Sequence, residues 1–86
     1  MFAEYTLADN GTAGPITHVG GQMHISVKGT WGSGSASIQF DMGNGYVEEE
    51  AWTADDAKVF SVPQGAEAKI VLSGASSPDL DIMFRA

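Results

Sequence analysis

The sequence predicts an all-β fold, a small antiparallel β-sandwich of about seven short strands that is either Ig-like or jelly-roll-like. Apolar and polar side chains alternate along several segments, and this period of two places one row of side chains on a core. Clusters of glycine, asparagine, aspartate and proline separate the segments roughly every dozen residues. No segment forms a convincing helix. A small barrel is the main alternative, because periodicity does not separate a barrel from a sandwich.

The first predicted strand spans residues 2–7, with Ala3, Tyr5 and Leu7 on one side. Asp9-Asn10-Gly11 ends it, since these residue types favour turns. The apolar residues at this end of the chain are not needed by the rest of the sandwich pattern. Residues 1–8 are therefore either a first strand or an assembly arm that packs on a neighbouring subunit.

A loop through Gly14-Pro15 follows, and then a short extended piece at residues 16–19, which Gly20-Gly21 closes. The next strand, residues 23–28, alternates cleanly. Its core face is predicted to carry Met23, Ile25 and Val27, opposite His24, Ser26 and Lys28.

Residues 29–52 contain the clearest hairpin of the sequence. In its first strand the predicted inward residues are Ala36, Ile38, Phe40 and Met42. Asn44-Gly45 is the dipeptide that a two-residue type I′ turn requires, so Gly45 is predicted to need a positive φ. The return strand runs through residues 47–52.

Three more segments complete the chain, each bounded by turn residues. A turn or one helical turn at residues 53–56 precedes a strand at 58–62, which Pro63 stops. Two further strands follow at residues 68–73 and 80–85. The residues predicted to face inward in these two strands are Ile70, Leu72, Leu80, Ile82 and Phe84.

Length and composition limit the class of protein. Eighty-six residues make one domain, residues 1–86, and the absence of cysteine excludes disulfides and thiol chemistry. The net charge of −7 should repel phosphate backbones, so no nucleic acid is expected as a partner. No apolar run approaches the ~20 residues that span a bilayer, and the N-terminus lacks the pattern of an export signal. We expect a soluble protein with no membrane partner.

The residues that could carry chemistry do not form a recognisable site. His18 and His24 have no cysteine or His-x-x-x-His spacing near them, so surface histidines are expected rather than zinc ligands. No serine lies in a Gly-x-Ser-x-Gly elbow. The carboxylates at residues 48–50, 55–56, 79 and 81 lack the spacing of a calcium loop, and we expect acidic surface there. We therefore predict no enzyme, with no catalytic residue, metal or cofactor.

The two tryptophans allow two interpretations. Trp31 lies in the glycine-rich segment 29–34, which does not match a phosphate loop because no lysine follows the glycines. Trp52 ends the return strand. Each tryptophan either plugs the sandwich or is exposed to stack on a sugar or a partner, and burial is the usual state of a large aromatic.

Residues 29–84 carry a series of turn and core motifs that resembles small β-sandwich proteins of tailed-bacteriophage virions. The first 28 residues lie outside the resemblance. The quoted motifs contain no catalytic position. They are Gly29-Thr30-Trp31, Phe40-Asp41 with Gly43, Tyr46-Val47, Val62-Pro63 with Gly65, and Ser73-Gly74-Ala75.

The resemblance implies a structural virion protein, most simply a capsid decoration or cement protein that acts as a homotrimer. Its expected location is the virion, and its expected partners are the major capsid protein or other virion proteins. Burial of surface across capsid subunits would stabilise the shell by mass action. The alternatives are a tail or head-fibre component, or a carbohydrate-binding module that uses Trp31 or Trp52. The residues predicted to form the interface are Met1, Phe2, Tyr5, Leu7 and Trp31.

Overall fold

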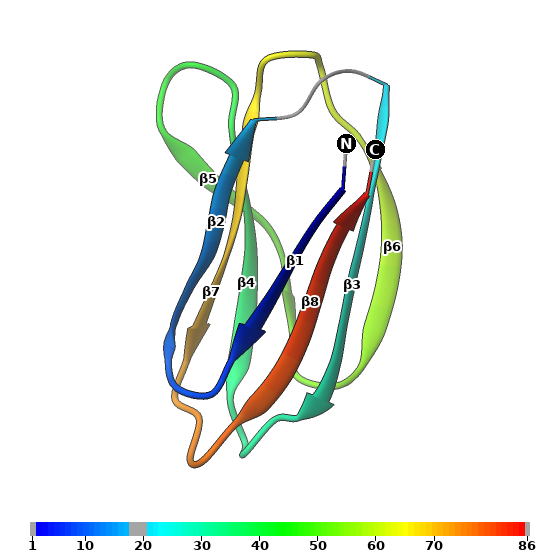
Figure 1. The fold of residues 1–86 in the computed structure, drawn as a ribbon. Helices are drawn as coiled ribbons and strands as arrows, with labels where there is room; N and C mark the ends of the chain where they lie inside the picture. Colours follow the sequence, from blue (N-terminus) through cyan, green and yellow to red (C-terminus); the bar gives the residue numbers. More distant parts are fainter. Residues whose placement is uncertain (1, 18–20, 86) are drawn as a thin grey trace.

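The computed structural model describes residues 2–17 and 21–85, which form eight β-strands and no helix. The strands are β1 (Phe2–Leu7), β2 (Gly11–Thr17), β3 (Gln22–Thr30), β4 (Ser35–Asp41), β5 (Tyr46–Trp52), β6 (Asp56–Ser61), β7 (Glu67–Ser73) and β8 (Asp79–Arg85). Figure 1 shows the strands running nearly parallel to one long axis, with the loops gathered at the two ends.

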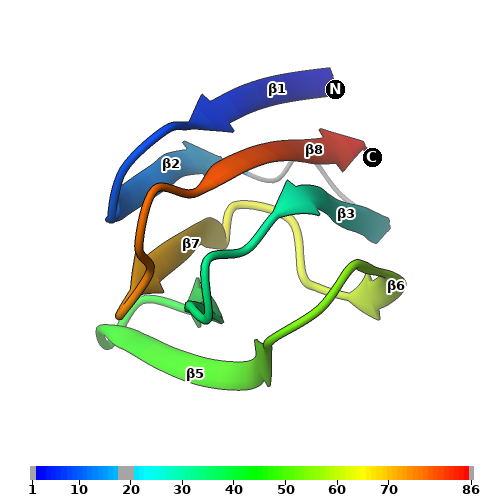
Figure 2. The same ribbon diagram turned by 90° about the horizontal axis from the view of Figure 1, so that it is seen from below.

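The strands form two four-stranded antiparallel sheets that face each other (Figure 2). Sheet A has the order β1-β8-β3-β6, and sheet B has the order β2-β7-β4-β5. The first strand pairs with the last, the second with the seventh, the third with the sixth and the fourth with the fifth. This nesting is one long hairpin wrapped into two sheets, which is a jelly roll. The predicted β-sandwich is confirmed in its jelly-roll form, and the barrel alternative is wrong.

The core lies between the sheets and contains the inward residues of both. The alternation predicted for residues 23–28, 68–73 and 80–85 is confirmed, because the inward residue of each pair is buried. Burying one such side chain contributes about 1.5–3 kcal/mol. The largest side chains that are fully enclosed are Phe84, Met23, Ile25, Ile38, Ile70, Leu72, Leu80, Ile82 and Val27.

β2 is the strand that the sequence pattern missed, because Gly14-Pro15 lies inside it and not in a loop. The register against β7 shifts between Ala13 and Ile16, so residues 14–15 form a bulge. Gly14 has a φ of +105°, which glycine adopts readily. A proline is tolerated here because β2 is an edge strand and the bulge needs no ladder bond from residue 15. Of the extended piece expected at 16–19, residues 18–19 lie outside the described residues.

The central hairpin is present, but the type I′ turn predicted at Asn44-Gly45 is wrong. Asp41 pairs with Tyr46, which leaves a four-residue loop, 42–45. The positive φ expected at Gly45 is found (+103°), whereas Asn44 is not among the residues with positive φ. One carboxylate oxygen of Asp41 accepts hydrogen bonds from the N–H groups of Gly43 (2.7 Å) and Gly45 (3.0 Å). Met42, predicted to face inward, lies in this loop and is 55% exposed.

Residues 2–7 form an edge strand, which is the first-strand alternative for this segment. β1 pairs with β8 along its whole length, from Phe2 opposite Arg85 to Leu7 opposite Leu80. The Tyr5 ring packs edge-on against Phe84, with ring centroids 5.9 Å apart. The half-buried residues Ala3, Tyr5 and Leu7 therefore cover one side of this chain's own core.

Candidate interaction surface

Metal clusters and pockets are two features that the described residues lack. Within 2–17 and 21–85, no group of histidine and acidic residues is close enough to hold a metal ion. The same residues enclose no pocket. No helix among them could cross a membrane. The surface that remains for an interaction consists of the outer faces and edges of the two sheets.

The residues predicted to form an interface do not gather in one patch. Phe2 lies on the outer face of sheet A and is 54% exposed. Tyr5 and Leu7 point the other way and pack against the core. Trp31 follows the end of β3, at the opposite end of the sandwich from Phe2 (Figure 1). Met1 lies outside the described residues. Of the set, Phe2 remains available as a surface residue.

Trp31 closes one end of the sandwich and is held in place by Asp55. Its ring is half-buried against the core, and its indole N–H donates to Asp55 Oδ1 at 2.8 Å. The Gly29 N–H donates to the same oxygen at 3.0 Å. These two bonds, the one from Trp31 first, lower the pKa of Asp55. The structure therefore supports the plug interpretation for Trp31.

Trp52 is also a core residue. It is 5% exposed and stacks on Phe60 with centroids 6.5 Å apart. Its indole N–H donates to Glu50 Oε1 at 3.0 Å, and Glu50 also forms an ion pair with Lys58. Lys58 and then Trp52 lower the pKa of the Glu50 carboxyl. Because its ring is covered, Trp52 offers no platform on which a sugar could stack.

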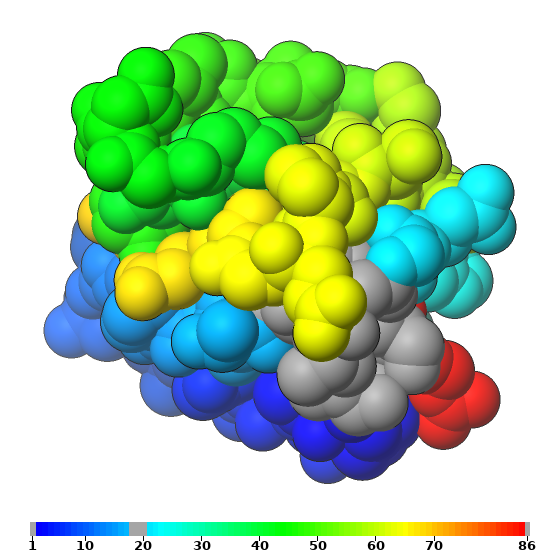
Figure 3. Space-filling model, turned by 90° about the horizontal axis from the view of Figure 1, so that it is seen from above, coloured from blue at the N-terminus to red at the C-terminus, as the bar shows by residue number. Residues whose placement is uncertain are grey.

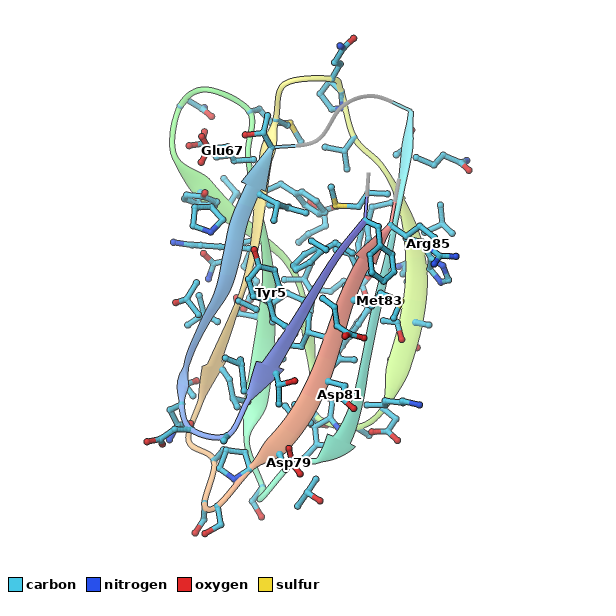
Figure 4. All side chains as sticks on the ribbon, viewed as in Figure 1. Tyr5, Glu67, Asp79, Asp81, Met83 and Arg85 are labelled. Carbon is cyan, nitrogen blue, oxygen red and sulfur yellow. The ribbon has the colours of Figure 1, made fainter. Side chains whose placement is uncertain are left out.

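The outer face of sheet A, called the A face below, carries side chains in level rows across its four strands. Phe2, Arg85, His24 and Val59 form one row, since each is the register partner of the next. Figure 4 shows Met83 and Arg85 on the outer side of β8. The Arg85 guanidinium lies 4.9 Å from the Phe2 ring centroid, and Val59 at the far end of the row is 49% exposed. The A face thus presents exposed apolar groups at both of its edges.

The outer face of sheet B carries a cluster of polar and aromatic side chains that contact one another. The Tyr46 hydroxyl donates to Glu67 Oε1 at 2.8 Å, and the Lys69 ammonium lies 3.9 Å from the Tyr46 ring centroid. Burial and then the Glu67 carboxylate raise the pKa of Tyr46 to about 12. Gln39 and Ser37 hydrogen-bond beside them at 2.9 Å. These side chains use their polar groups in contacts with one another, so we do not choose this face as the interaction surface.

The loop end near residue 42 carries two exposed apolar side chains. Seen from above, loop 42–45 (green) stands beside turn 62–66 (yellow), and the start of β1 and the end of β8 lie on the opposite side (Figure 3). Met42 and Val47, 55% and 62% exposed, belong to this part of the molecule. They are separated from Phe2 by the thickness of the sandwich, so they do not belong to the A face.

No protein-family model matches this chain, and no curated protein matches it. Among solved structures, the chain is similar to the crystal structure of PirA, with a TM-score of 0.50 and 14% sequence identity. The match covers 96% of this chain and 91% of that one. At this identity the likeness shows the fold alone. The resemblance to phage virion proteins remains an interpretation of the sequence.

Sequence reasoning missed the A face as a site. The alternation of β1, β3 and β8 could have identified its members one strand at a time. Their grouping depends on sheet order, which places the first strand next to the last. Strand order is set by long-range pairing and leaves no local pattern in the sequence.

Proposed function

We propose that this protein is a non-catalytic structural component of a virus particle, specifically a capsid decoration protein that docks on the outer shell through the A face. The observation that carries the proposal is the row from Phe2 to Val59, which exposes two large apolar side chains on the outer face of one sheet. A protein that binds only the assembled shell stabilises it by mass action, and no catalytic group is needed for this.

Two further observations support the proposal. The jelly roll is a fold used in viral capsids, although also in lectins and other proteins, so this support is by analogy. The motifs behind the phage resemblance are also structural in this molecule. A side chain at Gly29 would meet the Asp79 carbonyl oxygen at 2.1 Å. Close backbone packing therefore requires glycine at this motif position.

The two tryptophans do not favour the carbohydrate-binding alternative. Trp52 is covered, and the indole N–H of Trp31 is occupied by Asp55. Sugar binding by a module of this kind needs an exposed ring that stacks on the ligand. Neither tryptophan therefore supports a carbohydrate-binding function. A tail or head-fibre position is distinguished from decoration by the experiment below.

The test is quantitative mass spectrometry of density-purified virus particles from the organism that encodes the chain, followed by rebinding of the purified protein to stripped particles. We expect the chain on particles at a high copy number that follows the number of capsid subunits. Phe2→Ser should weaken rebinding, whereas Val47→Ser, an exposed valine remote from the A face, should not. Absence from particles would refute the proposal, and a low copy number confined to tails would replace decoration with a tail role.

A further inference from the structure

The four free sheet edges of this sandwich are not equally protected. The edges of sheet B are both irregular. β2 has the bulge at Gly14-Pro15, and β5 has a bulge at Glu49, because Ile38 pairs with Glu50 while Gln39 pairs with Glu48. Bulges, proline and charged side chains are the devices that keep an edge strand from pairing with another chain. Sheet B is thus blocked on both sides.

The edges of sheet A have unbroken registers. β1 pairs with β8 without a shift, and β6 pairs with β3 without a shift. β1 lies against β2 across the narrow side of the sandwich (Figure 2), so part of its edge is covered. β6 has no comparable cover, since each of its residues except Phe60 is exposed. β6 is therefore the most open edge among the described strands.

The hydrogen-bond pattern shows which backbone groups β6 presents outward. Val62 N–H donates to the Gly21 carbonyl, and this pair continues the β3–β6 register by one position. Antiparallel pairs alternate between hydrogen-bonded and non-bonded. The pairs that contain Ser61, Val59 and Ala57 are consequently non-bonded, and their N–H and C=O groups point away from β3.

The outward N–H group of Ala57 bonds to a side chain and not to another strand. The Ala57 N–H donates to the carboxylate of its neighbour Asp56, at 2.8 Å, instead of to a strand. Within the described residues, the N–H groups of Val59 and Ser61 have no such acceptor. A backbone of this kind is a template for an added strand.

The charges around β6 indicate the chemistry of that strand. Lys58 is the one cation of β6, and its pKa is raised by a hydrogen bond to Glu50 and by the nearby charges of Asp56 and Glu49. Asp55 lies just before the strand. Acidic groups therefore outnumber basic ones along this edge, which favours a partner that carries the opposite charge.

We propose that the β6 edge is a docking site for an extended, lysine- or arginine-bearing segment of a partner protein, which joins sheet A as a fifth strand. Main-chain hydrogen bonds to Ala57, Val59 and Ser61 supply the affinity, and the surrounding carboxylates select a basic segment. A second copy of this chain fits less well, because it brings another net charge of −7 to an acidic edge. The inference goes beyond the proposed function and does not depend on it, since it names the edge and the strand chemistry, whichever protein carries the segment.

The probe for this site is an end-capped peptide of about eight residues that alternates lysine and valine, titrated into the isotope-labelled protein and followed by amide NMR. Three twin peptides carry glutamate for lysine, N-methylated backbone nitrogens, or proline for valine. We expect shifts centred on β6 and slowed hydrogen exchange at Val59 and Ser61 with the lysine peptide. The three twins should bind at least about tenfold more weakly, because each lacks either the charge or the ladder bonds.

Matched variants locate the site. Val59→Pro removes an outward N–H and should abolish binding, whereas Val59→Thr keeps that N–H and should bind normally. Glu49→Lys should weaken binding about fivefold, a change of the size expected for exposed charge pairs. Glu4→Lys, the same charge change on β1, should not. Phe2→Ser should leave peptide binding unchanged even where it removes particle binding, so failures of the two proposals remain distinguishable.

Several results would overturn the inference. Equal binding of the N-methylated peptide would mean that charge alone acts, and shifts centred away from β6 would place the site elsewhere. Self-association that Val59→Pro abolishes, seen by light scattering without peptide, would make a second copy the occupant. Because Val59→Pro itself could unfold the chain, the Glu49→Lys and Glu4→Lys pair and the modified peptides decide the question independently.

Discussion

At the residue scale, burial by strand alternation decides which side chains matter for stability. Phe40 is 4% exposed and its ring lies 5.3 Å from that of Phe60, whereas its neighbour Gln39 faces the outer side of sheet B. The two residues differ by one position in sequence and lie on opposite faces of the same strand. The sequence pattern predicted this difference correctly, because period-two alternation is local.

Phe40→Ala should be among the costliest substitutions, at about 3–5 kcal/mol, since it removes a buried ring and leaves a cavity. Gln39→Ala should change the free energy of unfolding by less than about 0.5–1 kcal/mol, because it removes only one half-buried hydrogen bond, to Ser37. Urea denaturation of the two variants tests this. Equal losses at the two positions would contradict the observed alternation.

Tyr46 provides a pH test at the same scale. Its pKa in the folded state is about 12, above the ordinary value of 10.0, because of burial and then the Glu67 carboxylate. Between these two values the unfolded chain releases the proton and the folded chain keeps it. The stabilising contribution is thus complete below pH 10 and is lost as the pH rises towards 12.

Ultraviolet titration of a Tyr5→Phe variant, in which Tyr46 is the remaining tyrosine, should show ionisation well above the ordinary range. Glu67→Gln should move that ionisation to lower pH, since it removes the negative charge next to the phenol. A midpoint at the ordinary value in the Tyr5→Phe protein would mean that the bond to Glu67 does not persist in solution.

At the element scale, the sequence predicted strands better than connections. Seven of the strands coincide with predicted strand segments, whereas the first half of β2 is missed because glycine and proline usually interrupt strands. Both residues lie in a bulge at 14–15, and this bulge is recognised from the pairing of β2 with β7 and not from the local sequence. The turn predicted for the central hairpin is wrong because it, too, depends on contacts that the local sequence pattern does not show. Asn44-Gly45 favours a two-residue turn, but the Asp41 carboxylate holds a four-residue loop instead.

The loop geometry leads to a prediction about Gly45. Its φ of +103° is one that valine adopts only with strain, although a Cβ at this position would have no atom within 4 Å of it. Gly45→Val should therefore destabilise the protein by about 1 kcal/mol or more through the backbone alone. Gly45→Asn should cost less. Thermal melting of the two variants decides, and a harmless valine would show that the loop takes another conformation.

Asp41→Ala tests the other half of the loop. It removes the acceptor of two backbone hydrogen bonds, from Gly43 and Gly45, in an exposed position. A loss of about 1 kcal/mol is expected, since each exposed bond contributes modestly. Asp9→Ala, which removes the acceptor of a single local bond from the Asn10 N–H, is the control and should cost less.

At the scale of the whole molecule, the jelly-roll order makes the chain ends interdependent. β1 and β8 are neighbours although they lie at opposite ends of the sequence, and β8 in turn pairs with β3. The candidate site depends on this arrangement, because the A face is assembled from strands distant in sequence and β6 has a free edge as the last strand of sheet A. Local periodicity could predict their side-chain orientation but not their neighbours, which is why the interface set was dispersed over two ends.

The same interdependence sets the outcome of removing residues 1–8. The deletion takes away the partner of β8 along six register positions and uncovers the core beside Tyr5 and Leu7. Each of those side chains contributes up to about 1.5–3 kcal/mol when fully buried, while a small domain has a total stability of about 5–15 kcal/mol. The truncated chain should therefore lose most of its stability, by contrast with an arm, whose loss would leave the domain folded. Circular dichroism with urea denaturation measures this, and Thr6→Ala, an exposed change in the same strand, is the control. A truncated chain that unfolds with an unchanged midpoint would show that sheet A does not need β1.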